Sequence, residues 1–463
     1  MRRCLVLAVI LSATALPVSA AHANSTQTTL FEAPVQLLND STRDATLDQL
    51  QGLGVKAIRE IVTWKDVAPS PDATQKPSFD ATDPNAYNWG LFDRLVAAAR
   101  ARGMRMYFTL TAPAPKWATE GKTDYVTRPI PSEFGAFATA AGRHFGNLIA
   151  WWSIWNEPNH PLFLDPQYVH GKPYSGKLYR PLLIAAINGL RSAGITAPIL
   201  MGETAPTGSA HDVTPLAFLQ QTLCLNSSYH KVGSCPKINV SGYATHPYTT
   251  AAGPFHAPPA GDVMIGVLSR LTTALDKAAR AGAIPAHLPL YLTEFGTQSF
   301  PDTIAGVSLP KQSDYRSIAE YIAFHNPRVR TFSQYLLIDS APNPGSTSII
   351  DRYPGFESGL YLYPGTKKKP AYDSFRTPLV ARRRGGSVSL WGFVRPAAGP
   401  GTVTVTYARA GSSTYHTLKR VHYGSSGYWT ASARFVKGTR YRVRWRDATG
   451  QSFTGPPTAS YKF

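Results

Sequence analysis

Two glutamates stand where apolar runs of the sequence end and polar residues begin. Glu157 follows the run WWSIWN at positions 151–156, and Glu294 follows the run LYLT at positions 290–293. A carboxylate at the end of a buried segment is costly unless it is paired or functional. Two carboxyl groups with different pKa values can together catalyse a displacement at carbon. One protonates the leaving oxygen, and the other attacks the carbon or activates a water molecule. We therefore take Glu157 and Glu294 as candidate catalytic residues.

The segments that must position these glutamates alternate between short apolar runs and helical patterns. This strand–helix alternation predicts a parallel sheet, and eight units in about 350 residues predict a (β/α)8 TIM barrel. An open doubly wound sheet would need a glycine-rich turn after its first strand, and residues 37–40 offer none. The predicted strands are residues 34–38, 55–62, 105–110, 149–155, 199–202, 240–246, 290–294 and 331–338, and the clearest helices are 89–102, 132–145, 178–193, 263–282 and 313–324.

In a TIM barrel the catalytic residues lie where strands end and the following loops begin. Glu157 ends the fourth predicted strand and Glu294 the seventh, so both are expected at one end of the barrel. Arg59 is at the end of the second strand, where a cation beside Glu294 would keep that carboxylate ionised. His246 and Tyr248 follow the sixth strand and are expected at the same end.

The motifs around the two glutamates resemble those of glycoside hydrolase clan A. The Asn-Glu-Pro run at 156–158 and the Thr-Glu-Phe-Gly run at 293–296 carry the resemblance, which covers roughly residues 30–376 and is nearest to families 5 and 39. It implies that Glu157 is the general acid/base and Glu294 the nucleophile of a retaining glycosidase. Retention predicts carboxyl groups about 5–5.5 Å apart. No cofactor and no metal site are implied.

The resemblance also assigns residues to the substrate. Asn156 would hydrogen-bond the sugar 2-hydroxyl, Arg59 would hold the nucleophile ionised, and His246 and Tyr248 would contact the nucleophile or the sugar. Two tryptophans in the loops after the second and third strands, Trp64 and Trp117, are candidates for stacking on sugar rings at the rim of the cleft, with simple packing as the equal alternative.

Two departures from the clan pattern stand out. Clan members often end the eighth strand with a tryptophan that floors the catalytic subsite, but here Gln334 and Tyr335 stand in that region and are the candidates to replace it. Family 5 members commonly place a histidine after the third strand, where this chain has Thr-Leu-Thr-Ala-Pro at 109–113. The second departure favours a family 39-like or unclassified relative.

The N-terminus predicts export. Arg2 and Arg3 precede an apolar stretch at 5–16, and Ala-His-Ala at 21–23 forms a small-residue cleavage pattern, so residues 1–23 are expected to be a secretory signal peptide. Removing it leaves two cysteines, Cys224 and Cys235, in a polar segment of an exported chain, which predicts a disulfide that closes a surface loop. We expect a secreted protein, with association to a cell wall as a further option.

A second module is expected after a catalytic domain at 24–378. Residues 379–463 alternate strictly between apolar and polar positions, which predicts a small all-β sandwich of the immunoglobulin or fibronectin type. The segment 382–463 has 14 basic residues and one acidic residue, Asp447, so it carries +13 of the chain's formal +19. This charge favours either a solvated face or adhesion to an anionic cell-wall polymer or acidic glycan. Nucleic acid is not expected as a ligand, because the protein is predicted to be exported.

The sequence thus predicts a secreted retaining glycoside hydrolase that acts on an extracellular oligo- or polysaccharide. After the first segment no apolar run reaches about 18 residues, so no transmembrane segment is expected once the signal is cleaved. Two alternatives stay open. One is a catalytically silent glycan-binding protein on the same barrel, and the other is a cell-surface attachment protein whose function lies in the basic module.

Overall fold

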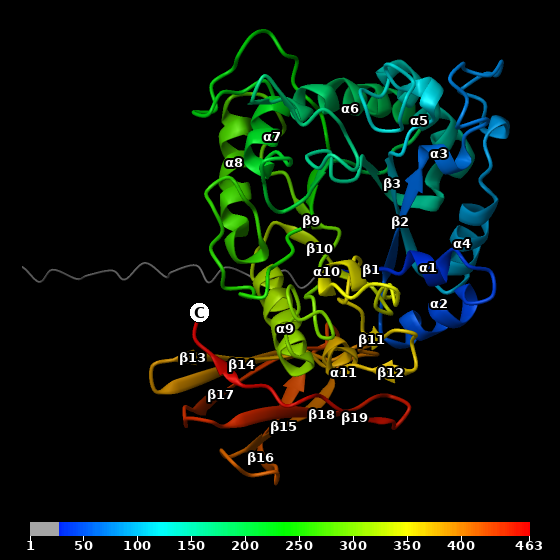
Figure 1. The fold of residues 1–463 in the computed structure, drawn as a ribbon. Coiled ribbons are helices and arrows are strands. Elements are labelled where there is room, and N and C mark those ends of the chain that lie inside the picture. Colours follow the sequence, from blue (N-terminus) through cyan, green and yellow to red (C-terminus); the bar gives the residue numbers. More distant parts are fainter. Residues whose placement is uncertain (1–26) are drawn as a thin grey trace, which may run out of the picture.

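The computed structural model describes residues 27–463, so the predicted signal peptide lies outside the described residues. Eight parallel strands close into a barrel in the order β1-β10-β9-β8-β7-β4-β3-β2, which confirms the predicted TIM-barrel fold (Figure 1). The strands are β1 (Thr28–Glu32), β2 (Ala57–Thr63), β3 (Arg105–Thr111), β4 (Ile149–Ile154), β7 (Ile199–Thr204), β8 (Gly242–Thr245), β9 (Leu290–Leu292) and β10 (Val329–Tyr335).

Helices surround the barrel (Figure 1), and several of them bury an apolar face against it. In α8 (Leu268–Arg280) the buried positions 268, 271, 274, 275 and 278 follow the helical period, and the chain turns at Gly282 with φ +71°. The other long helices are α2 (Arg43–Gly52), α4 (Gly90–Ala101), α5 (Pro131–Phe145), α6 (Ser175–Ser192), α7 (Pro215–Thr222), α9 (Leu309–Phe324) and α11 (Pro370–Arg376), and the short ones are α1 (Pro34–Leu37), α3 (Trp64–Val67) and α10 (Ile349–Arg352).

The first barrel strand lies earlier in the chain than the sequence predicted. Residues 34–37 form helix α1, because Pro34 occupies the first helical turn, where its missing N–H costs nothing. Strand β1 instead spans Thr28–Glu32 and pairs with β2 on one side and β10 on the other. The correction matters for the site, because it places Glu32 at the end of a barrel strand.

The C-terminal module consists of two four-stranded sheets, in the orders β17-β14-β13-β20 and β16-β15-β18-β19. The inward positions of both sheets form one core, which includes Leu390, Val403, Trp429 and Val443, as the predicted alternation requires. This arrangement fits the predicted sandwich. Its strands are β13 (Leu379–Arg384), β14 (Ser387–Phe393), β15 (Gly401–Ala408), β16 (His416–Tyr423), β17 (Tyr428–Arg434), β18 (Arg440–Arg446), β19 (Ser452–Thr454) and β20 (Ser460–Tyr461).

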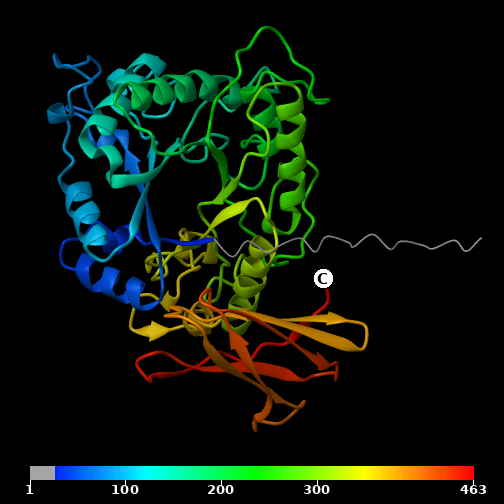
Figure 2. The same ribbon diagram turned by 180° about the vertical axis from the view of Figure 1, so that it is seen from behind.

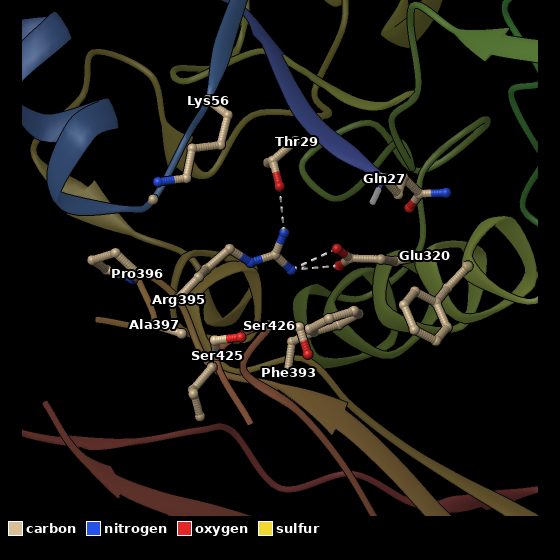
Figure 3. A pocket seen from close by; sticks show the side chains of 13 residues that line it. Gln27, Thr29, Lys56, Glu320, Phe393, Arg395, Pro396, Ala397, Ser425 and Ser426 are labelled. Atoms are coloured by element: carbon tan, nitrogen blue, oxygen red, sulfur yellow. Dashed lines mark hydrogen bonds and ion pairs between the residues drawn. The ribbon is translucent and has the colours of Figure 1, made fainter. Parts of the chain in front are cut away.

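The module packs against α9 at the side of the barrel (Figures 1 and 2). Trp391 of the module and Phe324 of the barrel belong to one buried apolar cluster. Arg395 reaches from the module to the buried carboxylate of Glu320, with Nη2 at 2.6 and 2.7 Å from its two oxygens, and Nη1 lies 3.4 Å from the hydroxyl of Thr29 (Figure 3). The module is therefore joined to the barrel by apolar contact and by a buried ion pair.

The predicted disulfide is confirmed. Cys224 and Cys235 are bonded with an S–S distance of 1.97 Å, and the loop that they close follows α7. Within residues 27–463, no helix combines the length and the apolar character that a membrane crossing requires.

Candidate active site

Glu157 and Glu294 meet at the end of the barrel where the strands terminate. Glu157 comes three residues after β4, the fourth barrel strand, and Glu294 comes two residues after β9, the seventh. One carboxylate oxygen of each and one ring nitrogen of His246 all lie within 4.8 Å of one another. The side chain of Glu157 is 17% exposed and that of Glu294 is 9% exposed. Both carboxyl groups are thus mostly shielded from water and close enough to act on one bond.

The turn after β4 sets the direction of Glu157. Its backbone has φ +39°, and its N–H donates to the carbonyl of Glu203 at 2.9 Å. Trp155, two residues earlier, has φ +71°, and its N–H donates to the carbonyl of Leu110 at 2.8 Å. Left-handed backbone costs about 1–3 kcal/mol for such residues and persists only where its surroundings enforce it. The hydrogen bonds to the neighbouring strands β3 and β7 supply that constraint.

Arg59 lies at the centre of a fully buried polar network below the two glutamates. Its Nη1 donates to Glu294 Oε1 at 2.7 Å and also to Glu32. Its Nη2 donates to Glu203 Oε2 at 2.7 Å and to Asn156 Oδ1 at 2.8 Å. Burial lowers the pKa of Arg59, but the surrounding carboxylates raise it by more, so its pKa lies well above the usual value. The guanidinium therefore keeps its charge beside Glu294.

The contacts of Asn156 fix the orientation of its amide. The oxygen accepts from Arg59, and the backbone N–H donates to Thr111 Oγ1 at 2.9 Å. The amide nitrogen is then the part of the side chain left to donate to a ligand, as a contact with a sugar hydroxyl requires.

The environment of Glu294 favours its ionised form. Burial raises the pKa of this carboxyl, but the charges of His246 and Arg59 and the hydrogen bonds from Tyr248 and Arg59 lower it by more. The Tyr248 hydroxyl donates to Glu294 Oε2 at 2.8 Å. The net result is a pKa below the ordinary glutamate value, which is what a carboxylate nucleophile needs.

His246 lies between the two glutamates and is fully buried. Its Nδ1 is 2.9 Å from Glu157 Oε1, and its Nε2 is 3.5 Å from Glu294 Oε1. Burial lowers the pKa of His246, but Glu294 and Glu157 raise it by more, so it lies above the usual histidine value. The imidazole thus lies close to both carboxyl groups, with Nδ1 hydrogen-bonded to Glu157 and, among residues 27–463, no hydrogen-bond partner at Nε2.

Two further glutamates belong to this network and were not chosen from the sequence. Glu203, near the end of the fifth barrel strand β7, accepts from Arg59, from Tyr107 OH at 2.8 Å and from Thr109 Oγ1 at 3.1 Å. Burial raises the pKa of Glu32 well above the usual range, although Arg59 opposes it. Glu203 could have been found from the sequence, because like Glu157 it is an acidic residue at the end of an apolar run. Glu32 could not, because the first strand was predicted at residues 34–38.

The structure does not place Trp64 and Trp117 at the rim of the cleft, so their proposed stacking on sugars is corrected to packing. Trp64 is 0% and Trp117 2% exposed. The Trp64 ring stacks on Phe137 of α5 at 5.5 Å and meets Trp117 edge-on at 5.8 Å. Neither ring has a free face for a ligand.

Gln334 likewise lies in the barrel wall and not in the cleft. Its Oε1 accepts from Arg316 Nε at 2.9 Å and its Nε2 donates to the carbonyl of Ser358 at 2.9 Å, so its amide is occupied by protein partners. The substrate contact expected of Gln334 is therefore wrong on geometric grounds.

Tyr335, the neighbour of Gln334, helps to form an aromatic wall beside Glu294. The Tyr335 and Tyr248 rings are 6.3 Å apart, and Phe356 lies 5.0 Å from the first and 5.6 Å from the second. Phe356 is 37% exposed, so part of this wall is open to a ligand. Phe356 could not be found from the sequence, because it lies on the long loop after β10, whose path does not follow from the local residue pattern.

The donors of Glu157, His246 and Glu294 are spaced closely enough to hold a metal ion. Arg59, however, is 2.7 Å from Glu294 and already supplies a positive charge there, so an added cation would be repelled. The arrangement of one ionised carboxylate and a second carboxyl group nearby is suited to nucleophilic attack and proton transfer.

Comparison with known proteins agrees with this chemistry. The model of the cellulase family, glycosyl hydrolase family 5, matches residues 20–328, a range that includes both glutamates. A family 39 glycoside hydrolase from Bacteroides cellulosilyticus is similar in structure at 15% identity, with a TM-score of 0.53 over 91% of this chain and 81% of that one. A glucosidase from Croceicoccus marinus is similar at 12% identity, with a TM-score of 0.51 over 90% and 97%. The two structural likenesses support the shared fold alone.

Proposed function

Since the chain belongs to glycosyl hydrolase family 5, the cellulase family, and is a glycoside hydrolase, we propose that it cleaves its substrate with retention of anomeric configuration. Glu157 is the general acid/base in this proposal and Glu294 is the nucleophile. The family match means that the absence of a histidine after the third strand does not exclude family 5.

The first step forms a covalent glycosyl-enzyme. The carboxyl group of Glu157 gives its proton to the glycosidic oxygen as the bond to the anomeric carbon breaks. The carboxylate of Glu294 attacks that carbon from the opposite face. As its oxygen bonds to carbon it loses negative charge, and the Tyr248 and Arg59 hydrogen bonds to it weaken. Asn156 donates to the 2-hydroxyl of the sugar, a contact that strengthens toward the transition state.

The second step reverses the roles. Glu157, now a carboxylate, removes a proton from a water molecule, and the oxygen of that water attacks the anomeric carbon. The bond to Glu294 breaks and its carboxylate returns to the Arg59 and Tyr248 contacts. Two inversions at one carbon give net retention.

The observation that carries this proposal is the short separation of two carboxyl groups of different character. Inversion would need a gap of about 6.5–9.5 Å to hold a water molecule between carboxylate and sugar. An oxygen of Glu157 and an oxygen of Glu294 lie within 4.8 Å, and the pKa of Glu294 is lowered. This geometry supports direct attack by Glu294.

We also propose that the enzyme is secreted and acts on an extracellular oligo- or polysaccharide. The signal-like N-terminus and the Cys224–Cys235 disulfide support export, since disulfides persist in oxidising compartments. The basic C-terminal module supports contact with an anionic cell-wall or glycan surface.

The test is a screen of the purified mature protein on a panel of polysaccharides and aryl glycosides. We expect sugar release by the wild type and none by the Glu294→Gln variant, which has the same shape but no nucleophile. Equal release by both would contradict the assignment of Glu294. Glycan binding without release by the wild type would favour a silent barrel.

A further inference from the structure

The sheet β16-β15-β18-β19 has an outer face made of hydroxyl and basic side chains. Thr404 of β15 is paired with Arg420 of β16 on one side and with Arg444 of β18 on the other. Because side chains alternate along a strand, the residues two positions away repeat this row on the same face. We call this surface the trough. The hollow over it is lined by Thr402, Thr404, Arg420, His422, Arg444, Arg446, Ser452 and Thr454, together with the aromatic residues Trp445 and Phe453.

The difference in side-chain length makes this face concave. Short threonines occupy the middle strand β15, and long basic side chains stand on β16 and β18 on either side. The hollow that results has a volume of about 650 Å³. Adjacent strands are about 5 Å apart, so the two basic rows are roughly 10 Å apart, which leaves room for one extended chain between them.

The cations of the trough have no protein partner. Over residues 27–463, the side chains of Arg420, Arg444 and Arg446 take part in none of the ion pairs or hydrogen bonds. The single acid of the segment 382–463, Asp447, accepts from the backbone of Thr449 and Gln451, both at 2.9 Å. The trough therefore offers free guanidinium groups with no competing carboxylate.

The trough is also open to a partner. Figure 1 shows β15, β16, β18 and β19 on the side of the module that is turned away from the barrel, while the other sheet packs on α9. Arg395, in contrast, is buried against Glu320, so this basic residue of the module is not available to a ligand at the surface. Three exposed cations of the module, Arg420, Arg444 and Arg446, line the hollow.

We propose that the trough binds a linear polysaccharide that carries carboxylate groups. The planar guanidinium fork matches a carboxylate with two parallel hydrogen bonds, and the threonine hydroxyls can exchange hydrogen bonds with sugar hydroxyls between the basic rows. The choice of a polysaccharide over other polyanions rests on the proposed function of the barrel. Single-stranded nucleic acid would need exposed rings for its bases, but Trp445 and Phe453 stack on each other at 5.4 Å, and Trp445 is 4% exposed.

The experiment measures binding of the mature full-length protein to polygalacturonate at low ionic strength, with neutral dextran and a DNA oligonucleotide as comparisons. The test variant replaces Arg420, Arg444 and Arg446 with Ser. The matched control replaces three exposed cations outside the trough with Ser and removes the same charge, namely Arg384, Arg409 and Lys437.

We expect the wild type to bind polygalacturonate but not dextran, with an affinity that falls as salt is added. The trough variant should lose at least tenfold in affinity and the control less than threefold. Equal losses in both variants would overturn the proposal, because charge alone would then explain binding. No binding by the wild type, or tighter binding to DNA through the same three arginines, would overturn it as well.

Hydrolysis of a small aryl glycoside, measured on the same preparations, separates this proposal from the proposed function. Both triple variants should retain wild-type hydrolysis, since none of the replaced residues belongs to the active site. Trough-dependent binding in a protein without hydrolysis would leave the trough intact and refute the proposed function. Hydrolysis without binding of polygalacturonate would refute the proposal for the trough and leave the proposed function intact.

Discussion

Replacing Tyr248 with Phe isolates one of the interactions that keep Glu294 ionised. The change removes the hydroxyl that donates to Glu294 Oε2 at 2.8 Å and leaves the ring in place. Arg59 at 2.7 Å and His246 at 3.5 Å from Glu294 Oε1 remain. Burial, which raises the pKa of Glu294, is then opposed by one interaction fewer.

The size of the effect follows from the type of hydrogen bond. A hydrogen bond to a charged group contributes about 1.5–3 kcal/mol. Its loss therefore raises the pKa of Glu294. Since about 1.4 kcal/mol is a factor of ten in an equilibrium, the ionised carboxylate is disfavoured about ten- to a hundredfold. The nucleophile must be ionised to attack, so the acidic limb of kcat/KM should move to higher pH. At a pH below both limbs, the variant should be about ten- to a hundredfold slower for this reason alone.

The assay is the pH dependence of kcat/KM on an aryl glycoside, with Tyr335→Phe as the control. The Tyr335 ring lies 6.3 Å from that of Tyr248, but among residues 27–463 its hydroxyl donates no hydrogen bond to Glu294. The control should keep the acidic limb of the wild type. An unchanged limb in Tyr248→Phe, or a shift to lower pH, would refute the role of this hydrogen bond.

Three further predictions concern the acid/base, the disulfide and the module. Glu157→Ala should lower kcat by about 10²–10⁴ on substrates with poor leaving groups and far less on activated phenols, and a series of leaving groups that all slow equally would contradict general-acid catalysis. Replacing Cys224 and Cys235 with Ser should lower the free energy of unfolding by about 3 kcal/mol in a urea titration without changing kcat, and an unchanged titration midpoint would contradict it. Arg395→Met should cost about 3 kcal/mol by the same titration, because buried Glu320 loses a partner, whereas a loss under 1 kcal/mol would show that the ion pair does not join module and barrel.

The barrel could be predicted because its strands are buried on both faces and therefore appear as apolar runs. β2, β3 and β4 lie within one or two residues of the predicted runs. β1 could not be predicted, because Leu30 and Phe31 form only a short apolar run between the polar ends Thr28 and Glu32. Its strand conformation depends on pairing with β2 and β10. Local pattern carries no information on such partners.

Arg59 lies inside β2, which runs from Ala57 to Thr63, and not at the end of the strand as predicted. The positions of Glu157 and Glu294 were predictable in the same way as the strands, since each glutamate follows the end of an apolar run. The four-way contact of Arg59 was not, because its partners come from four other strand ends that only barrel closure brings together. The prediction that Trp64 and Trp117 stack on sugars was wrong for a related reason. Whether Trp64 faces solvent or core is decided by Phe137 of α5, far along the chain, and not by the loop that carries it.

The central claim is that Glu294 forms a covalent bond to the sugar, and trapping that bond tests it most directly. A 2-deoxy-2-fluoro glycoside of the sugar identified in the screen slows both steps, and a good leaving group lets the intermediate accumulate. Mass spectrometry of the digested protein should show one added sugar on the peptide that contains Glu294, and none in Glu294→Gln. A sugar attached to another residue, or continued hydrolysis with inverted product by NMR and no adduct, would contradict the account.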